Sequence, residues 1–373
     1  MPGPVLIAPD KFKGSLTAPG VADAVADGLR RAAPDVEVRS VPIADGGDGT
    51  VESALASGYR SVPVLVAGPV GDPVPTEIAL HEGTAVVELA SASGLALLDP
   101  DDLSPMGASS EGTGEAIAAA LDAGARTVVL GVGGSACTDG GAGLLTVLGA
   151  RLLDVDGHQL PPGGGPLARV AEVDLAGLDR RLADVEFVLA SDVDNPLLGV
   201  RGAAHVYGPQ KGAGPEQVEL LDTALARFAD AVVRAGGRDV AGQPGAGAAG
   251  GVGFGALSVL GARMRPGVDV VLELVGFADQ LAGAGLVITG EGSIDEQTLH
   301  GKGPAGVAER ARDAGIPVIA VAGRCPLPAD RLRAAGFERV YALTDVEPDL
   351  ERCQREAGVL LAGVGEALAR DWL

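Results

Sequence analysis

Short apolar runs alternate with helix-period segments at both ends of the chain. The stretch PVLIAPD near the N-terminus predicts a short buried strand, and Thr17 can cap the helix that follows it. In that helix Val21, Val25 and Leu29 recur every four residues. Near the C-terminus GLVITGE, IPVIAVAG and RVYALT predict strands that are separated by helices. Strands that alternate with helices of this length predict a parallel sheet with helices on both faces.

The middle of the chain follows a different pattern. Residues 77–90, EIALHEGTAVVELA, predict a hairpin of two strands around Glu82-Gly83-Thr84. Helices are expected near 113–123, 141–150 and 216–235, and strands in TVVLG and DVEFVLASD.

These patterns predict an α/β protein made of two α/β domains. One doubly wound, mostly parallel sheet would be built from both chain ends, residues 1–70 and 281–373. The second α/β domain would be inserted between them as residues 71–280.

Composition and charge narrow the class of protein. The chain has 373 residues, 47% of them hydrophobic, and its net charge of −22 disfavours nucleic acid or an anionic membrane as partner. Cys137, Cys325 and Cys353 form no CxxC pair, and neither a secretory signal nor an apolar run of membrane-spanning length is evident. We expect a cytoplasmic protein, a monomer or a homodimer, that acts on a small molecule.

Six polar or glycine-rich clusters follow predicted strands or open predicted helices. They are APDKFKGS, IADGGDGT, GVGGSACTDGGAG, SDVDNP, GPQKGA and TGEGSIDEQTLHGKGP. In open α/β sheets ligands bind outside the carboxyl ends of the strands, so these clusters are candidate site segments. Each has a simpler alternative: Asp-Gly is common in turns, Asp192 and Asn195 could form a turn before Pro196, and most lysines are solvated.

The clusters contain the residue types that phosphoryl transfer needs. Glycine-rich turns let backbone N–H groups approach phosphate oxygens, loop carboxylates suit Mg²⁺, and lysines suit phosphates and carboxylates. Neither a P-loop nor a GxSxG motif is present. The GxGxxA at 131–136 lacks the later acidic residue of a dinucleotide site, and the GxGxxG within PGAGAAGGVGFG has no strand before it. The residues alone indicate an α/β enzyme that uses ATP or phosphate.

Taken together and in this order, the six motifs resemble the bacterial glycerate kinase family, of the type that generally makes 2-phosphoglycerate. The resemblance extends from about residue 4 to the mid-340s. It implies ATP-dependent phosphorylation of D-glycerate with Mg²⁺, and a two-domain fold with the site between the domains. Arg324, which follows AVAG, stands where the family usually has a small or polar residue. It could add a cation near the cleft, but we expect it at the surface.

The resemblance also implies roles for residues within the motifs. Asp192, Lys11 and Asp48 are expected to be catalytic, and Asp192 is expected to accept the proton of the C2 hydroxyl. The residues expected to bind the substrate are Lys13, Ser15, Asp45, Gly46, Gly47 and Lys211. Those expected to bind ATP are Gly133, Gly134, Ser135, Asp139, Glu291, Asp295 and Lys302. Asp194 and Asp45 are expected to hold Mg²⁺.

Other functions stay open at this point. The enzyme could be a glycerate 3-kinase, or its substrate could be a related small hydroxy acid. A regulator that binds a nucleotide or an anion without turnover could use the same fold, and turnover of MgATP with D-glycerate distinguishes it from a kinase. A nicotinamide-dependent oxidoreductase is disfavoured by the missing ribose-binding acid.

Overall fold

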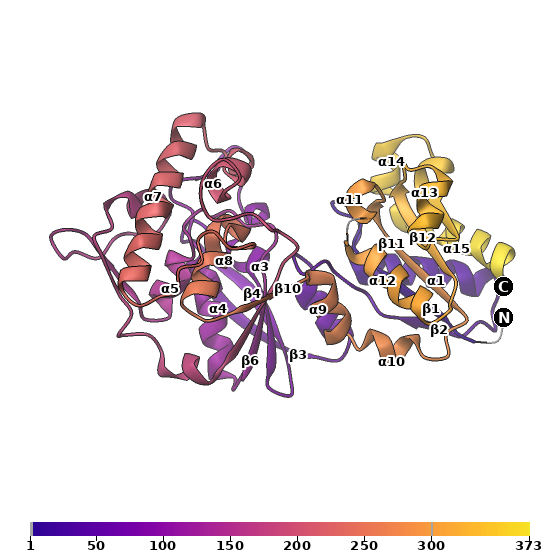
Figure 1. Cartoon of the computed structure of the whole chain (residues 1–373). Coiled ribbons are helices and arrows are strands. Elements are labelled where there is room, and N and C mark those ends of the chain that lie inside the picture. The colour runs from indigo at the N-terminus through magenta and orange to yellow at the C-terminus, as the bar shows by residue number, and fades with distance from the viewer. Residues whose placement is uncertain (1–2, 300) are drawn as a thin grey trace. The chain divides into compact units, whose positions relative to one another are not determined.

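The computed structural model describes residues 3–299 and 301–373, and it divides into two compact units (Figure 1). The first unit comprises Met1–Asp45, Glu52–Gly58 and Gly267–Leu373, and the second comprises Gly46–Val51 and Tyr59–Pro266. The boundaries predicted from the sequence, near residues 70 and 280, differ from these. Residues 60–67 form a strand that pairs within the second unit, and Val268 and Phe277 belong to the core of the first.

Both chain ends contribute strands to the sheet of the first unit. Its main elements are β1 (Val5–Pro9), α1 (Ala18–Ala32), β2 (Val38–Ser40), α9 (Gly267–Leu274), α10 (Phe277–Leu281), β11 (Leu286–Ser293), α11 (Glu296–Leu299), α12 (Gly303–Asp313), β12 (Val318–Arg324), α13 (Ala329–Ala334), β13 (Arg339–Ala342), α14 (Leu350–Arg355) and α15 (Ala357–Trp372). Helix α2 (Thr50–Ala56) contains residues of both units. The strand order is β13-β12-β11-β1-β2, and each neighbouring pair is parallel.

The chain leaves the centre of this sheet in two directions. From β1 it passes through α1 to β2 on one side, and from β11 through α12 to β12 on the other. The topological switch point therefore lies between β1 and β11, where doubly wound sheets bind their ligands.

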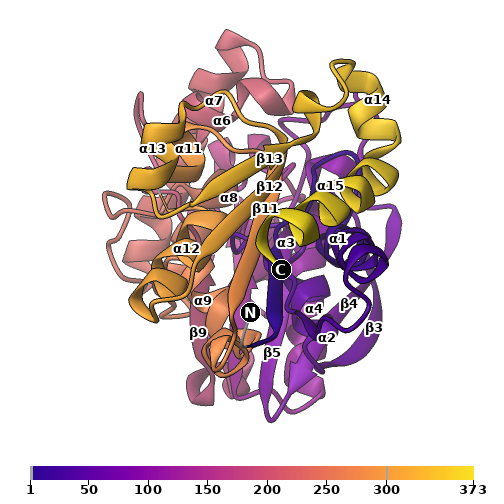
Figure 2. The same ribbon diagram turned by 90° about the vertical axis from the view of Figure 1, so that its right-hand side faces the viewer.

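Alternate residues of β1 face opposite layers of helices. Val5 and Ile7 pack with α1 and α15, which lie side by side in Figure 2, whereas Leu6 and Ala8 pack with α9 and α12. This two-sided burial explains why the strand is apolar at every position. Thr17 caps α1 as predicted, because its hydroxyl accepts a hydrogen bond from the Gly20 N–H.

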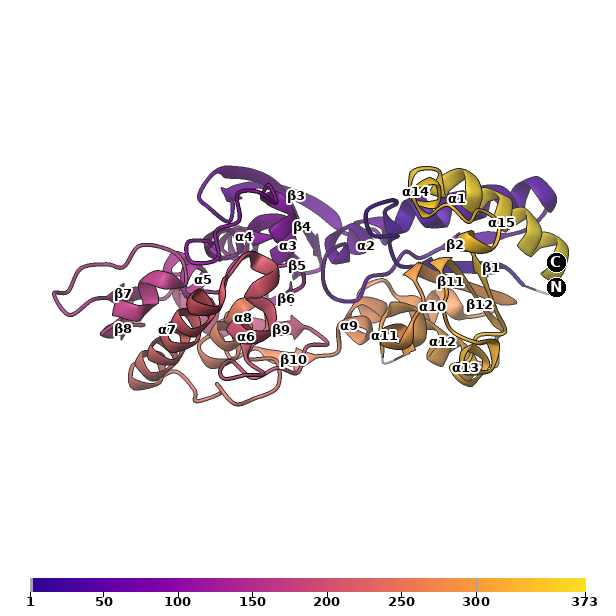
Figure 3. The same ribbon diagram turned by 90° about the horizontal axis from the view of Figure 1, so that it is seen from above.

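The second unit has its own sheet and a separate hairpin. Its main elements are β3 (Arg60–Ala67), β4 (Pro73–His81), β5 (Thr84–Glu88), α3 (Leu89–Ser93), α4 (Glu111–Asp122), β6 (Thr127–Gly131), α5 (Ala142–Val147), β7 (Arg151–Leu153), β8 (Glu172–Asp174), β9 (Glu186–Ala190), α6 (Ala203–Tyr207), α7 (Pro215–Arg234), α8 (Ala248–Ser258) and β10 (Arg263–Arg265). The main sheet has the order β10-β9-β6-β5-β4-β3. The antiparallel pair β7 and β8 lies apart from it (Figure 3).

Parallel and antiparallel pairing are combined in this sheet. Strands β5, β6, β9 and β10 are parallel, and β4 and β3 extend the sheet in antiparallel pairing. The predicted hairpin is confirmed, with Glu82 and Gly83 both at positive φ in the two-residue turn between β4 and β5. The predicted fold class of two α/β domains is confirmed, whereas the cleft between them stays a prediction.

Across residues 3–299 and 301–373 the structure contains no helix that is both long and apolar enough to cross a bilayer. Cys137, Cys325 and Cys353 are free thiols.

Candidate functional site

The carboxyl edge of the first sheet brings together residues of the N- and C-terminal motifs. Asp10 follows β1 directly, and its backbone N–H donates to the Gly290 carbonyl of β11 at 2.7 Å. The Ile43 N–H donates to the Pro9 carbonyl at 2.9 Å, which brings the segment before Asp45 to the same edge. A side chain at Gly303 would begin 3.6 Å from Asp10 Oδ2, so the first turn of α12 lies against this carboxylate.

Asp10 lies in the first candidate motif, APDKFKGS, but no role was predicted for it. Its side chain is only 8% exposed, and Oδ1 accepts a hydrogen bond from the Lys11 N–H at 2.7 Å. The pKa of Asp10 is raised to about 8, first by burial and then by the neighbouring carboxylates of Asp45 and Glu291, against the opposing effect of Lys11. Asp10 therefore holds a proton at neutral pH unless a cation lies nearby.

Replacing Asp10 by asparagine is expected to stabilise the first unit by an amount that increases with pH. The folded state keeps the Asp10 proton up to about pH 8, whereas the unfolded chain releases it near its ordinary pKa, so wild-type stability falls as pH rises between these values. Asparagine has no proton to release. The free energy of unfolding of Asp10→Asn should exceed that of the wild type by close to zero at about pH 4 and by about 1–4 kcal/mol at about pH 8.

Urea denaturation in EDTA measures this difference. The chain has one tryptophan, Trp372, which packs against the core of the first unit, so its fluorescence reports that unit. Asp27→Asn, which changes an exposed carboxylate on α1, is the matched control and should show no such trend. A stability difference between Asp10→Asn and wild type that does not change with pH would contradict the assigned proton.

The motif that begins in the last residues of β11 and continues beyond it forms a second group at this edge. The Thr298 hydroxyl donates to Glu291 Oε1, and burial raises the pKa of Glu291 against the lowering effects of Thr298 and Lys302. Arg324 is exposed, as predicted, and its Nε donates to the Ser293 hydroxyl at 3.1 Å. Glu291, Asp295 and Lys302 thus interact as one electrostatic group.

Lys13 and Ser15 differ in what they can offer a ligand. The Lys13 side chain is exposed. The Ser15 hydroxyl donates its proton to the Gln354 carbonyl of α14 at 2.5 Å, so this proton is not available to a ligand in this conformation. Ser15 can still accept a hydrogen bond from a ligand.

The segment GGDGT lies against the carboxyl edge of the second sheet. A Cβ at Gly131 would lie 2.7 Å from the Gly46 carbonyl oxygen, and one at Gly133 would lie 2.8 Å from the Gly47 Cα. Only glycine permits such close approach of the two loops. Two of the six motifs therefore meet here, and the exposed Asp48 belongs to the first of them.

Glu88 holds this segment in place, and no sequence motif singled it out. It ends β5, is 6% exposed, and its Oε2 accepts hydrogen bonds from the N–H groups of Gly49 at 2.9 Å and Val51 at 3.3 Å. In the sequence Glu88 is a carboxylate at the end of an apolar strand, a pattern that does not distinguish it from the last residue of any other strand.

The loop after β6 is shaped by the buried carboxylate of Asp139. Asp139 is 0% exposed. Its Oδ2 accepts from the Ser110 N–H, the Ser110 hydroxyl and the Gly143 N–H, and its Oδ1 accepts from the Gly141 N–H. We predicted that Asp139 binds ATP, but these contacts give it a structural task within the loop instead.

Lys211 also lies under this loop. Its side chain is 2% exposed, and Nζ donates to the Ser135 hydroxyl at 2.8 Å and to the Cys137 carbonyl at 2.5 Å. The predicted direct contact between Lys211 and the substrate does not fit this burial. Gly133 and Gly134 remain accessible above it, half-buried and exposed respectively.

The packing of the segment PGAGAAGGVGFG accounts for its many glycines. Ala249, Gly250 and Gly251 have positive φ, and a Cβ at Gly250 would lie 2.0 Å from the Cys137 carbonyl oxygen. The run therefore provides a close backbone approach to the loop after β6.

The segment SDVDNP follows β9 at the same edge of the second sheet. Asp192 and Asp194 are both exposed, and Asp194 forms an ion pair of 3.8 Å with Arg201. The amide of Asn195 donates to the Arg201 carbonyl and accepts from the Tyr207 hydroxyl. Asn195 thus braces the loop that presents Asp192.

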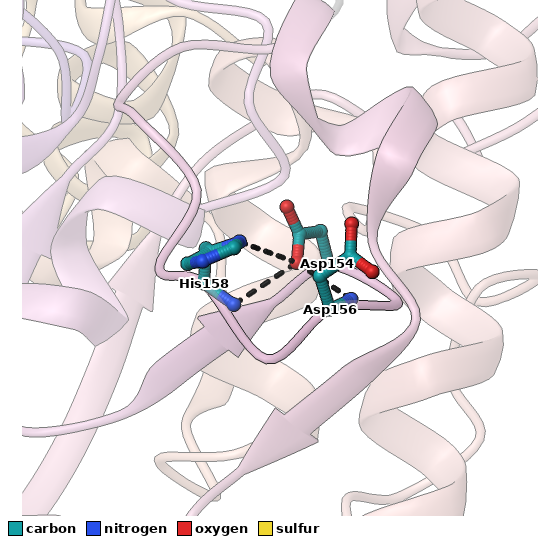
Figure 4. A group of neighbouring side chains, drawn as sticks. All are labelled: Asp154, Asp156 and His158. Atoms are coloured by element: carbon teal, nitrogen blue, oxygen red, sulfur yellow. Dashed lines mark hydrogen bonds and ion pairs between the residues drawn. The ribbon is translucent and has the colours of Figure 1, made fainter.

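One acidic group lies away from these edges. Asp154, Asp156 and His158 could each offer a ligand atom to a metal, as Figure 4 shows. Asp154 Oδ1 already accepts from the N–H groups of Asp156 and His158, which is the geometry of a turn. Within the described part of the chain this is the group of three or more such residues that lies close enough to hold an ion.

Each unit therefore collects predicted site residues at the carboxyl edge of its own sheet. The first unit contains Lys11, Lys13, Ser15, Asp45, Glu291, Asp295 and Lys302. The second contains Gly46, Gly47, Asp48, Gly133, Gly134, Ser135, Asp139, Asp192, Asp194 and Lys211. The two predicted Mg²⁺ ligands, Asp45 and Asp194, belong to different units, and their shared ion stays a prediction.

Mostly parallel sheets with carboxylates, lysines and glycine-rich loops at their carboxyl edges define an α/β enzyme for small anionic ligands. A family model described as the glycerate kinase family matches residues 5–373. The chain belongs to the glycerate kinase family and is a phosphotransferase.

Named relatives match over nearly the whole chain. A protein of Bacillus subtilis strain 168 named glycerate kinase is 44% identical, covering 98% of this chain and 96% of the relative. A protein of Escherichia coli K12 named glycerate 2-kinase is 41% identical, covering 91% and 90%. A crystal structure from Salmonella typhimurium LT2, described as a candidate glycerate kinase 2, has a TM-score of 0.86 at 41% identity and covers 100% of this chain and 98% of its own.

Proposed function

We propose that this phosphotransferase is a glycerate 2-kinase, which transfers the γ-phosphoryl group of ATP to the C2 hydroxyl of D-glycerate. Membership of the glycerate kinase family over residues 5–373 carries the proposal. The Escherichia coli relative that is named glycerate 2-kinase favours the C2 hydroxyl over the C3 hydroxyl.

The chemistry needs a base for the hydroxyl proton, cations for the phosphates, and carboxylates that hold the metal ion. Asp192 is proposed to accept the proton of the C2 hydroxyl, whose oxygen then attacks the γ-phosphorus while the bond to the β-phosphate oxygen breaks and ADP leaves. Its exposure at the end of β9 supports access to a substrate. Lys11 is proposed to pair the substrate carboxylate or the transferred phosphoryl group, and Asp48 is the rival base.

The remaining predicted contacts are proposed in groups. Those for glycerate are Lys13, Ser15, Asp45, Gly46 and Gly47, and those for ATP are Gly133, Gly134, Ser135, Glu291, Asp295 and Lys302. The burial of Asp139 and Lys211 favours support of the ATP loop over contact with a ligand.

The donor chemistry fits Mg²⁺. Asp45 raises the pKa values of Asp10 and Glu291, so these carboxylates lie near enough to repel one another, and a cation would relieve the repulsion. Asp45 and Asp194 are proposed to hold the ion, whose carboxylate oxygen ligands are those Mg²⁺ prefers. When bound, Mg²⁺ neutralises charge on the phosphates of ATP.

Incubation with MgATP and D-glycerate, followed by phosphorus NMR, tests the proposal. The expected products are ADP and 2-phosphoglycerate. A 3-phosphoglycerate signal would reassign the hydroxyl that is phosphorylated, and the absence of ADP would favour a binding protein without turnover. Tartronate and L-glycerate serve as comparison substrates, and faster turnover of either would move the proposal to a related hydroxy acid.

A further inference from the structure

Lys211 is too deeply buried, at 2% exposed, to meet a substrate. It ends a short 3₁₀ turn, Pro209–Lys211, and its ammonium lies 2.8 Å from the Ser135 hydroxyl and 2.5 Å from the Cys137 carbonyl oxygen. A Cβ at Gly250 would begin 2.8 Å from the same nitrogen, so the glycine run from α8 closes the other side. Both hydrogen bonds of the ammonium therefore go to the loop after β6.

Burying a charged amine is costly, and this site offsets only part of the cost. Burial lowers the pKa of Lys211, while the buried carboxylate of Asp139 favours its charged form. Asp139 itself accepts four hydrogen bonds from Ser110, Gly141 and Gly143. An apolar side chain would fill the same space at lower cost, so loop support alone does not explain a lysine.

The lysine determines the direction of the Ser135 proton. An ammonium group has only donors, so the Ser135 oxygen must accept in this contact. The single hydroxyl proton of Ser135 is then free to point at another acceptor. Because the positive charge withdraws electron density from the oxygen, that proton becomes a stronger hydrogen-bond donor.

Ser135 stands where a ligand is expected. It follows Gly133 and Gly134 at the carboxyl end of β6, and it is 7% exposed. The loop is fixed on both sides of it, since the Leu95 N–H donates to the Gly134 carbonyl and the Ala136 N–H donates to the Ser93 carbonyl. A hydroxyl donor on a rigid glycine-rich loop suits a phosphate oxygen.

We propose that Lys211 is a positioning residue, which fixes the Ser135 hydroxyl as a hydrogen-bond donor to a phosphate oxygen of the bound reactants and does not touch them itself. The inference rests on the proposed function, because it takes the ligand to carry a phosphate group. It replaces the predicted contact between Lys211 and the substrate.

A double-mutant cycle tests this dependence. The variants are Ser135→Ala, Lys211→Met and the double substitution, and the measurements are kcat/KM for MgATP and for D-glycerate and the Kd of MgADP. Each single variant is expected to weaken binding or turnover about 10- to 100-fold, the usual effect of losing a hydrogen bond to a charged group. The loss of kcat/KM or affinity in the double variant should be no greater than the loss in the more impaired single variant. Both single substitutions remove the same hydrogen-bond donor, the oriented Ser135 hydroxyl.

The matched control removes a hydroxyl from the same loop. Among the residues that the structure describes, Thr138 Oγ1 is buried without a hydrogen-bond partner, so Thr138→Val should leave the kinetic constants unchanged. If Lys211→Met does not fold, the cycle is repeated with Lys211→Gln, whose amide can donate to Ser135 without a charge. Thermal denaturation of every variant separates lost stability from lost binding.

Additive effects of the two substitutions would overturn the proposal, as would a wild-type chain that binds neither MgADP nor inorganic phosphate. A coupling seen with MgATP but not with D-glycerate assigns the contact to the nucleotide, and the reverse assigns it to the phosphorylated product. Coupled losses of MgADP affinity without glycerate turnover would reject the proposed function and retain this inference. Normal turnover of D-glycerate together with additive losses would retain the proposed function and reject this inference.

Discussion

Replacing Asp192 by asparagine is expected to lower kcat about 10²- to 10⁴-fold with little change in stability. Asparagine keeps the size of the side chain and removes the group that would accept the hydroxyl proton. Because Asp192 is exposed at the carboxyl end of β9, its loss should leave the core of the second unit intact. Steady-state production of ADP with saturating MgATP and D-glycerate measures the effect.

The matched control is Asp184→Asn. Asp184 is also exposed, but it precedes the same strand at its amino end, away from the carboxyl edge. It should keep wild-type kcat. If Asp192→Asn retained wild-type kcat as well, Asp192 would not be the base, and Asp48→Asn would be the next variant to measure. A rise in KM alone would instead indicate that Asp192 binds substrate.

The second large effect is expected on stability. Replacing Asp139 by asparagine should lower the free energy of unfolding of the second unit by about 2–4 kcal/mol. The carboxylate accepts four hydrogen bonds in a fully buried position, and an amide nitrogen in place of one oxygen would face donors with no acceptor. It would also remove the negative charge that favours the charged form of Lys211.

Two probes separate this effect from global unfolding. Trp372 belongs to the first unit, so its fluorescence transition should move little, whereas circular dichroism should show the second unit unfolding at lower urea concentration. Asp230→Asn, an exposed carboxylate on α7, is the control and should cost less than about 0.5 kcal/mol. An Asp139→Asn variant as stable as this control would show that the hydrogen bonds contribute little.

Local patterns in the sequence were sufficient where local chemistry decides the conformation. Thr17 caps α1 because a hydroxyl before an apolar period satisfies an N–H of the first turn. Glu82-Gly83 forms the β4–β5 turn because two residues can take positive φ there. Family membership was equally accessible, since six motifs in order are a property of the chain alone. The same patterns missed β3, an edge strand that pairs with β4, the next strand along the chain.

The tertiary structure decided what each polar residue faces. Asp10 and Glu291 are 281 positions apart, and only the pairing of β1 with β11 brings them to one edge, where burial and repulsion raise the pKa of Asp10. Glu88 became a partner of Gly49 and Val51 in the same way. Lys211 was predicted to bind the substrate, yet the fold buries it and its Nζ donates a hydrogen bond to the Ser135 hydroxyl. The sequence by itself determined the types of residue available for phosphoryl transfer and the family. Exposure and electrostatic environment depend on contacts between distant segments, so only the folded chain distinguishes a residue that can meet a ligand from one that holds the loop beneath it.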